Sequence, residues 1–315
     1  MKLSSFIKYA YNEIRQNGRN PVWWYNRIND RINSHIHQAM FGDAGIQVMD
    51  EDWDTLIIID ACRVDVFEEL VDTTQFDEYR RVKSKGSATS EWSRKNFQND
   101  YDDTVYVSGM PTPNRHIKGE FVHFESVWEY GFDEEKGTIP AEAVTAAARD
   151  IHDSYPNKRL IVHYAQPHYP FVGSDFDFSY WRQTDDISFG GDDRARDAWD
   201  AIGQGLVGED EVLLAYRDNL GYVMEEVWNL IDHIDGRTVI HSDHGNMVGG
   251  RSWPIPVRVY GHPGNLWLKR LRTVPWAVLE TDTRRKITSG AVSHRDHHGD
   301  SHMKEKLAAL GYTES

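Results

Sequence analysis

The sequence predicts an α/β fold whose strands are mostly parallel. Apolar, β-branched runs such as residues 56–59 and 238–240 stop abruptly at polar residues, which is typical of strands buried on both faces of a sheet. Between such runs lie stretches with apolar residues at helical spacing. A chain of 315 residues, 39% of them hydrophobic, can bury a large core. We therefore expect one core domain, residues 51–290, with an N-terminal helical arm, residues 1–50, and a C-terminal tail, residues 291–315.

The composition limits the partners and the compartment. The formal net charge of −15 leaves no basic surplus to neutralise phosphates, so nucleic acid is not expected as a partner. This acidic balance suits a soluble protein of a salty, halophilic cytoplasm. The single cysteine, Cys62, cannot form a disulfide within the chain. We find no signal peptide and no apolar run of about 18 residues. A cytoplasmic protein is therefore expected.

The N-terminal arm is amphipathic and rich in aromatic residues. Apolar residues recur at helical spacing up to a break at residues 20–21, and again over residues 28–36. We expect the arm to pack on its parent domain or on a second subunit, which would make the protein a homo-oligomer. Binding to a membrane surface is the alternative, because basic residues accompany the apolar face. His35 and His37 are interpreted as isolated surface histidines.

The first core strand is expected at residues 56–59, and Asp60 follows it directly. The rim formed by strand carboxyl ends is where ligands bind in open α/β sheets. Asp60 therefore either points into a site or caps the helix expected at residues 64–70.

A turn of small and hydroxyl-bearing residues, 84–90, leads into a helix expected at residues 91–97. Hydroxyls at a helix N-terminus lie where free N–H groups and the helix dipole favour an anion. Ser87 or Thr89 can serve there as a nucleophile if a metal lowers the pKa of the hydroxyl. The alternative is an ordinary N-cap without chemistry.

Two further strands are expected at residues 104–108 and 159–163. A helix over residues 141–152 separates them, and Pro140 suits the first turn of that helix. The second strand runs into a rigid loop that carries His168. A histidine so placed can bind a metal or a substrate oxyanion, and the alternative is a satisfied core histidine.

An acidic, Gly-rich insertion over residues 174–210 is expected to lie over the sheet edge as a lid. A long helix over residues 211–234 follows, because apolar residues recur there at helical spacing. The strand expected at residues 238–241 comes next and delivers Asp243 and His244 to the rim of the sheet. A carboxylate beside an imidazole suits a divalent metal, and the alternative is a solvated turn.

Gly245 is expected to let the backbone turn sharply after the Asp-His pair. Further on, His262 lies in a tight turn, and residues 273–279 are interpreted as a last short strand. The histidines of the tail are expected to be solvated, where they can bind metal adventitiously.

Five of these stretches occur in the order seen in the alkaline phosphatase superfamily, and the chain resembles its sulfatase-like branch, haloarchaeal members included. The similarity spans about residues 50–280 and leaves the arm unexplained. It implies a central sheet sandwiched between helices, with a metal site at the carboxyl ends of the strands. The stretches are Ile-Ile-Ile-Asp60, Gly86-Ser-Ala-Thr89-Ser90-Glu91, His163-Tyr-Ala-Gln-Pro-His168, Ser-Asp243-His244-Gly245, and Tyr-Gly-His262-Pro followed by Leu271-Arg-Thr-Val-Pro-Trp.

The resemblance implies roles residue by residue. Asp60 matches the acidic metal ligand after the first strand, and Asp243 with His244 matches the late Asp-His pair. Thr89 is similar in placement to the nucleophilic threonine of lipoteichoic acid synthases, which implies that it also contacts the metal. Ser87 remains the competing candidate for the nucleophile.

His168 resembles the substrate-facing histidine of a His-x-Pro loop, and His262 resembles a histidine or lysine near the leaving group. The chain departs from the family in two places. Cys62 is not part of the Cys/Ser-x-Pro-x-Arg motif from which sulfatases make their nucleophile. The position four residues before His168, an aspartate in two-zinc phosphatases, is Tyr164. We therefore expect one divalent site, and its imidazole ligand favours Mn²⁺ or Zn²⁺ over Ca²⁺.

The resemblance implies a metal-dependent hydrolase or transferase of phosphate esters, with phosphodiesters favoured and Thr89 as nucleophile. Hydrolysis of sulfate or phosphonate esters is the alternative reaction, since these tetrahedral oxyanions differ little in shape. The substrate is expected to be a small molecule or a glycolipid or glycan that carries such an ester. A catalytically silent relative that uses the fold to bind a partner is the alternative of a different class.

Overall fold

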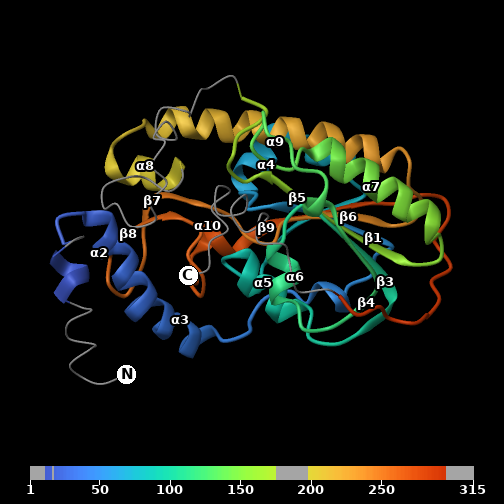
Figure 1. Cartoon of the computed structure of the whole chain (residues 1–315), viewed down its shortest axis with the longest axis horizontal. Coiled ribbons are helices and arrows are strands. Elements are labelled where there is room, and N and C mark those ends of the chain that lie inside the picture. Colours follow the sequence, from blue (N-terminus) through green and yellow to red (C-terminus); the bar gives the residue numbers. More distant parts are fainter. Residues whose placement is uncertain (1–10, 16–17, 175–197, 296–315) are drawn as a thin grey trace.

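A seven-stranded sheet forms the centre of the computed structural model, which describes residues 11–15, 18–174 and 198–295 (Figure 1). The strands of this sheet are β1 (Thr55–Asp60), β2 (Glu78–Lys83), β3 (Tyr101–Ser108), β4 (Phe121–Ser126), β5 (Arg159–Pro167), β6 (Thr238–His241) and β9 (Thr273–Leu279). Their order across the sheet is β2-β9-β6-β1-β5-β3-β4. A separate two-stranded hairpin consists of β7 (Met247–Arg251) and β8 (Arg258–Gly261).

The five strands from β6 to β4 pair in parallel, and β9 is antiparallel to both of its neighbours, β6 and β2. The predicted fold class, an α/β fold with a mostly parallel sheet, is therefore confirmed. The strand expected at residues 273–279 is present with those bounds, and the structure shows that its direction is reversed.

Helices cover both faces of the sheet. The helices α4, α7 and α9 lie on one face, and α5 and α6 lie on the other (Figure 1). The helices of the core are α4 (Val64–Leu70), α5 (Thr89–Asn96), α6 (Thr112–His116), α7 (Ala141–Ser154), α8 (Ala198–Gln204), α9 (Glu209–Ile231) and α10 (Lys269–Arg272). Short 3₁₀ turns span Val48–Asp50, Thr73–Gln75 and Val127–Glu129.

Strand β1 supplies side chains to both cores. Ile57 and Ile59 pack into the core under α4, α7 and α9, together with residues such as Phe67. Ile58, on the opposite face, packs into the core that contains Trp92 of α5. The strand is buried along its whole length, as expected for a central strand with side chains alternating between two faces.

Some bounds and elements differ from the predictions. Helix α5 begins at Thr89, two residues before the expected start, and α9 ends at Ile231, three residues before the expected end. Strand β2 was not predicted from the sequence. It lies at the edge of the sheet and exposes charged side chains on most of its positions, so it lacks the apolar pattern of a buried strand.

The N-terminal arm packs on the β7-β8 hairpin. Its helix runs without interruption through α2 (Pro21–Ile28), a π-helical turn (Asn29–Asn33) and α3 (Ser34–Phe41). The Asn33 side chain donates to the Ile255 carbonyl at 3.0 Å and contacts Ser252 Oγ at 2.7 Å. These contacts tie the described part of the arm to its own core domain.

The prediction that His37 is a surface residue is wrong. His37 is buried, and its Nδ1 accepts a hydrogen bond of 2.8 Å from the Trp267 backbone N–H. Its ring lies 4.4 Å from the ring of Trp253. The helix face that carries His37 turns toward the hairpin, whereas His35 lies on the outer side and is exposed, as predicted.

No helix among the described ranges is long and apolar enough to cross a lipid bilayer. Most of the insertion that we expected to act as a lid, residues 175–197, lies outside the described residues, and so does the tail from residue 296 onward.

Candidate metal centre

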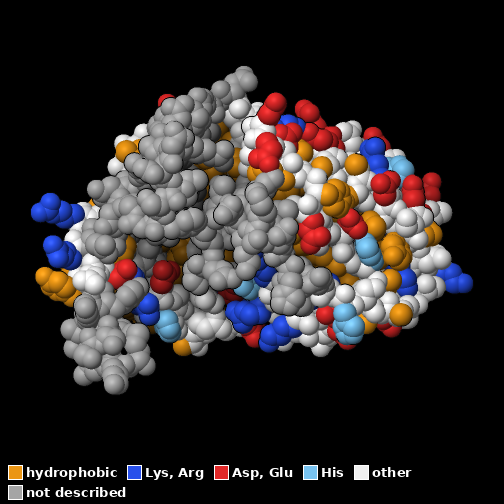
Figure 2. All heavy atoms as spheres, in the orientation of Figure 1, with side chains coloured by type: hydrophobic (Ala, Val, Ile, Leu, Met, Phe, Trp, Pro, Cys, Tyr) orange, Lys and Arg blue, Asp and Glu red, His pale blue; other side chains and the backbone are white. Residues whose placement is uncertain are grey.

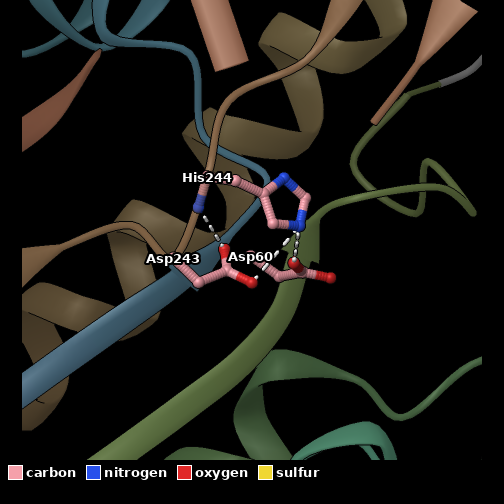
Figure 3. A group of neighbouring side chains, drawn as sticks. All are labelled: Asp60, Asp243 and His244. Atoms are coloured by element: carbon pink, nitrogen blue, oxygen red, sulfur yellow. Dashed lines mark hydrogen bonds and ion pairs between the residues drawn. The ribbon is translucent and has the colours of Figure 1, made fainter. Parts of the chain in front are cut away.

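Three ligand-bearing side chains meet where two neighbouring strands end. Asp60 is the last residue of β1, and Asp243 and His244 follow β6, which pairs with β1 in parallel. Parallel strands end at the same edge of a sheet, so the residues at their carboxyl ends come together there. The ligand atoms of these three residues lie within 4.8 Å of one another, and all three residues are buried. Figure 3 shows their side chains pointing toward one another.

His244 presents a nitrogen lone pair to both carboxylates. Its Nδ1 donates to the Gly245 carbonyl at 2.8 Å, which leaves Nε2 unprotonated in the neutral ring. This Nε2 lies 3.3 Å from Asp243 Oδ2 and 3.6 Å from Asp60 Oδ1. A backbone carbonyl that fixes the ring in this way is the usual arrangement for a metal-binding histidine.

The carboxylates have unused acceptor atoms that suit a cation. Asp60 Oδ2 and Asp243 Oδ2 are buried, and neither accepts a hydrogen bond from a described residue. Burial and the charge of Asp243 raise the pKa of Asp60 well above its ordinary value, because two buried carboxylates this close repel each other when both are ionised. Two carboxylates and an imidazole lone pair fit a divalent ion. Within the described part of the chain, no other group of three or more such side chains is close enough to share one.

The loop after β1 holds Asp243 in place. Asp243 Oδ1 accepts hydrogen bonds from the backbone N–H groups of Ala61, at 3.0 Å, and His244, at 2.9 Å. Ala61 adopts a φ of 59°, which is unfavourable for a residue other than glycine. The Tyr216 hydroxyl donates to the Ala61 carbonyl at 2.8 Å and thereby stabilises this conformation. No motif marks Ala61 or Tyr216 in the sequence, and we did not predict their contribution.

The Thr89 hydroxyl lies directly against the candidate metal centre. Thr89 Oγ1 is 3.1 Å from Asp60 Oδ1 and 3.2 Å from His244 Nε2. Thr89 is also the first residue of α5, where free N–H groups and the helix dipole favour negative charge. The structure thus brings Thr89 together with the three predicted ligands Asp60, Asp243 and His244.

Ser87, the competing candidate, has a different environment. Its hydroxyl donates to the Pro263 carbonyl at 2.8 Å and accepts from the Leu266 N–H at 3.1 Å. Glu91 Oε2 accepts from the Ser87 N–H at 2.9 Å. These bonds join the turn before α5 to the loop after β8, so Ser87 has a structural role in this arrangement.

Two glycines allow the close approach of backbones at this site. A Cβ on Gly86 would lie 2.5 Å from the Trp92 backbone nitrogen, and one on Gly245 would lie 2.0 Å from the Arg270 carbonyl oxygen. The φ of Gly245 is not in the left-handed region. A left-handed conformation is therefore not what requires glycine at this position, and close packing against α10 does.

His168 and His262 lie together beside His244. The Nε2 atoms of His168 and His262 are 2.8 Å apart, and the ring of His262 stacks on that of His244 with 4.6 Å between centroids. His168 Nδ1 donates to the Tyr169 carbonyl at 2.6 Å, so its Nε2 accepts the Nε2–H of His262. Burial lowers the pKa of His168 to about 4 and, with the neighbouring histidines, lowers the pKa of His262 well below its ordinary value. Both rings are therefore neutral at pH 7.

Cys62 and Tyr164, the two positions at which the sequence departs from the motifs of the superfamily it resembles, are both buried. Cys62 is fully buried, and burial raises the pKa of its thiol, which makes it a poor nucleophile. The Tyr164 hydroxyl lies 2.9 Å from Thr145 Oγ1, and its ring packs in the core under α7 and α9. Tyr164 thus points to the opposite side of the sheet from Ile58 and supplies no ligand to the centre.

No family model matches the sequence, and no curated protein matches it. Among solved structures, the chain is similar to the integral membrane protein lipooligosaccharide phosphoethanolamine transferase A (EptA) from Neisseria meningitidis, with a TM-score of 0.46 and 12% identity over 72% of this chain. The match covers 47% of EptA, so the chain spans about half of that protein.

Two further similar structures are matched over a larger share of their own chains. One is the periplasmic domain of EptC from Escherichia coli in complex with Zn, with a TM-score of 0.43 and 14% identity over 72% of each chain. The other is a phosphonate monoester hydrolase from Silicibacter pomeroyi, with a TM-score of 0.38, 12% identity, and coverage of 81% of this chain and 72% of that one. These likenesses are distant in sequence and partial in structure.

Proposed function

We propose that the protein is a metal-dependent hydrolase or transferase of phosphate esters, with phosphodiesters as the favoured substrates and Thr89 as the nucleophile. The observation that carries this proposal is the position of Thr89 Oγ1, 3.1 Å from Asp60 and 3.2 Å from His244 at the start of α5. A hydroxyl held against a metal centre and over free N–H groups is suited to attack an anionic ester.

Asp60, Asp243 and His244 would hold the ion, with Thr89 as a fourth contact. The imidazole among these ligands favours Mn²⁺ or Zn²⁺. A bound divalent ion supplies positive charge that lowers the pKa of a hydroxyl and stabilises charge on a phosphoryl group.

Thr89 performs the covalent step in this proposal. Its hydroxyl releases a proton to solvent, Oγ1 forms a bond to phosphorus, and the bond from phosphorus to the leaving oxygen breaks. The leaving alkoxide takes a proton from solvent and departs as the alcohol. A second molecule then attacks the same phosphorus and releases Thr89. In a hydrolase this molecule is water, and in a transferase it is an acceptor alcohol. The free N–H groups at the start of α5 stabilise the oxygens of the phosphoryl group in both steps.

His262 is suited to bind a substrate oxygen. Both rings are neutral at pH 7, and the Nε2–H of His262 can donate to an anionic oxygen. His168, whose one N–H is on Nδ1 and donates to the Tyr169 carbonyl, holds the His262 ring in position. Substrate would replace the contact between their Nε2 atoms, which are 2.8 Å apart.

The charges of the site favour a diester over a monoester. Among the described residues, no Lys or Arg pairs with Asp60, Asp243 or His244. A divalent ion would neutralise the two carboxylates, and a monoester dianion would then add two uncompensated charges to a buried site. A diester adds one, which costs less to desolvate.

The test uses a set of chromogenic esters. We expect bis(p-nitrophenyl) phosphate to be cleaved in the presence of Mn²⁺ or Zn²⁺, and cleavage to stop when the metal is removed by a chelator. The p-nitrophenyl esters of phosphate, sulfate and phenylphosphonate are compared under the same conditions. A preference for the sulfate or phosphonate ester would replace the proposed substrate class. Absence of turnover with every ester and metal would favour a catalytically silent binding protein.

A further inference from the structure

The inner face of the arm helix, residues 21–41, is unusually polar. Asn29, Asn33 and His37 follow one another at a spacing of four and are all buried. Asn29 and Asn33 bond to the hairpin through Ser252 and nearby carbonyls, and His37 bonds to the Trp267 N–H. These hydrogen bonds attach the arm to the core, together with contacts such as the stacking of Phe41 on Trp267.

The adjacent face is apolar and turned outward. We call it the outer stripe, and it contains Trp24, Ile28, Ile32, Ile36 and Met40. Side chains four residues apart are neighbours on a helix. Four residues are slightly more than one turn of an α-helix, so side chains four apart gradually shift around the helix axis. The π-helical turn within the arm has more residues per turn and offsets this shift.

The outer stripe is exposed at its two ends and its centre. Trp24 is 40% exposed, Ile32 41% and Met40 59%. A helix at the surface of a soluble protein usually buries its apolar face and exposes its polar face. This arm buries three polar side chains and leaves much of the outer stripe exposed, which is typical of a helix whose apolar face contacts a second apolar environment.

The charge of the arm indicates what that environment is. Residues 1–42 contain six basic and two acidic residues, whereas the rest of the chain contains 29 basic and 48 acidic residues. Arg15, Arg19 and Arg31 are exposed and form no ion pair with any described residue. Figure 2 shows Lys or Arg side chains next to hydrophobic ones at the end of the molecule where α2 lies.

We propose that the outer stripe binds an anionic lipid surface. The arm would lie in the interface, with Trp24, Ile32 and Met40 at the boundary of headgroups and acyl chains and the arginines near lipid phosphates. The acidic core would face away from the membrane. Pairing with the outer stripe of a second copy is disfavoured, because it would bring two positively charged arms together.

The test is cosedimentation of the full chain with vesicles. We expect binding to vesicles of equal parts phosphatidylcholine and phosphatidylglycerol, weaker binding to phosphatidylcholine alone, and a decrease with added salt. The double variant Ile32→Glu with Met40→Glu should bind the anionic vesicles at least about tenfold more weakly, since two charges would enter the apolar boundary. The matched control, Leu206→Glu with Leu214→Glu, changes two hydrophobic residues that are 50% and 61% exposed outside the arm and should bind normally.

Three results would overturn the proposal: no binding of the unaltered chain to anionic vesicles, equal binding of the Ile32→Glu/Met40→Glu variant, or equal loss in the control. Light scattering can give a fourth result that would overturn the proposal. A dimer that becomes a monomer in the arm variant would show that a second copy covers the outer stripe. Circular dichroism checks that each variant is folded, and Ile32→Ser with Met40→Ser replaces the first variant if it is not. Vesicle binding requires neither metal nor ester, so its outcome is independent of the proposed function.

Discussion

Thr89 Oγ1 and Asp60 Oδ1 lie 3.1 Å apart, although 29 residues separate them in the chain. Asp60 is fixed by the end of the central strand β1, and Thr89 by the start of α5 on one face of the sheet. A carboxylate that can bind a metal ion and a hydroxyl that can attack an ester thus come from two different elements of the fold. Their relationship leads to the first prediction.

Thr89→Ala should lower kcat for a chromogenic phosphodiester on the order of 10³-fold or more, because the variant lacks the nucleophile while the other groups of the site remain. KM should change much less, since His168 and His262 are retained. Steady-state kinetics measure both values. Ser87→Ala is the matched control and should cost far less, because its hydroxyl bonds to the loop after β8. An inactive Ser87→Ala with an active Thr89→Ala would move the nucleophile by two residues, and two active variants would indicate an activated water.

Asp243→Asn should remove most of the bound metal, because a neutral amide is a much poorer ligand for a divalent ion than a carboxylate. The fold should persist, since the amide oxygen can still accept from the Ala61 and His244 N–H groups. Elemental analysis of the purified variant measures the metal content. Asp65→Asn is the control: Asp65 pairs with Arg63 and its side chain is 51% exposed, so its metal content should be normal. Unchanged metal in Asp243→Asn would mean that the metal centre is placed wrongly.

Glu91→Ala should lower the free energy of unfolding by about 3–5 kcal/mol, because it leaves the buried Arg272 guanidinium without its carboxylate and Lys95 with only Asp43, at 3.5 Å. Glu91 Oε1 pairs with Lys95 at 2.8 Å and Arg272 at 2.7 Å, and all three side chains are almost fully buried. Urea unfolding followed by tryptophan fluorescence measures the change. Glu68→Ala removes a more exposed pair with Arg81 and should cost no more than about 1 kcal/mol. Equal effects of the two substitutions would contradict the role of the buried network.

His163 should make the protein less stable in mild acid. Burial lowers its pKa from 6.5 to about 4, so between these values the unfolded chain binds a proton that the folded chain does not. The free energy of unfolding therefore falls as the pH drops from about 6.5 to 4, and His163 contributes up to about 3 kcal/mol of this loss. Above pH 6.5 the contribution is constant.

The measurement is urea unfolding at pH 7 and pH 4.5 with a chelator present, for the unaltered chain and for His163→Gln. The variant loses the contact with the Tyr106 hydroxyl, 2.8 Å from Nδ1, and should be less stable at pH 7. Its stability should depend less on pH than that of the unaltered chain. The same dependence in both proteins would show that other buried groups cause the acid sensitivity.

The sequence by itself determined five of the nine strands among the described residues, four core helices to within three residues at each end, and the residues at several strand ends. Periodicity and turn residues act between near neighbours, so the run before Asp60 and the run before Asp243 could each be interpreted without the fold. The alternation of such runs with helical stretches was sufficient for the fold class. Four strands were not found: the edge strands β2 and β4 and the hairpin strands β7 and β8. In β2, exposed charges conceal the pattern.

Only the tertiary structure decided which of these side chains meet. It places the Thr89 hydroxyl at the candidate metal centre and the Ser87 hydroxyl against the loop after β8. It buries His37 and makes β9 antiparallel to β6. It also brings Nε2 of His168 to 2.8 Å from Nε2 of His262, 94 residues later in the chain. Each of these outcomes depends on the order of strands in the sheet and on the packing of loops over its rim. Local sequence preferences carry no information about such distant contacts, because the free energy that selects them arises only when the elements pack together.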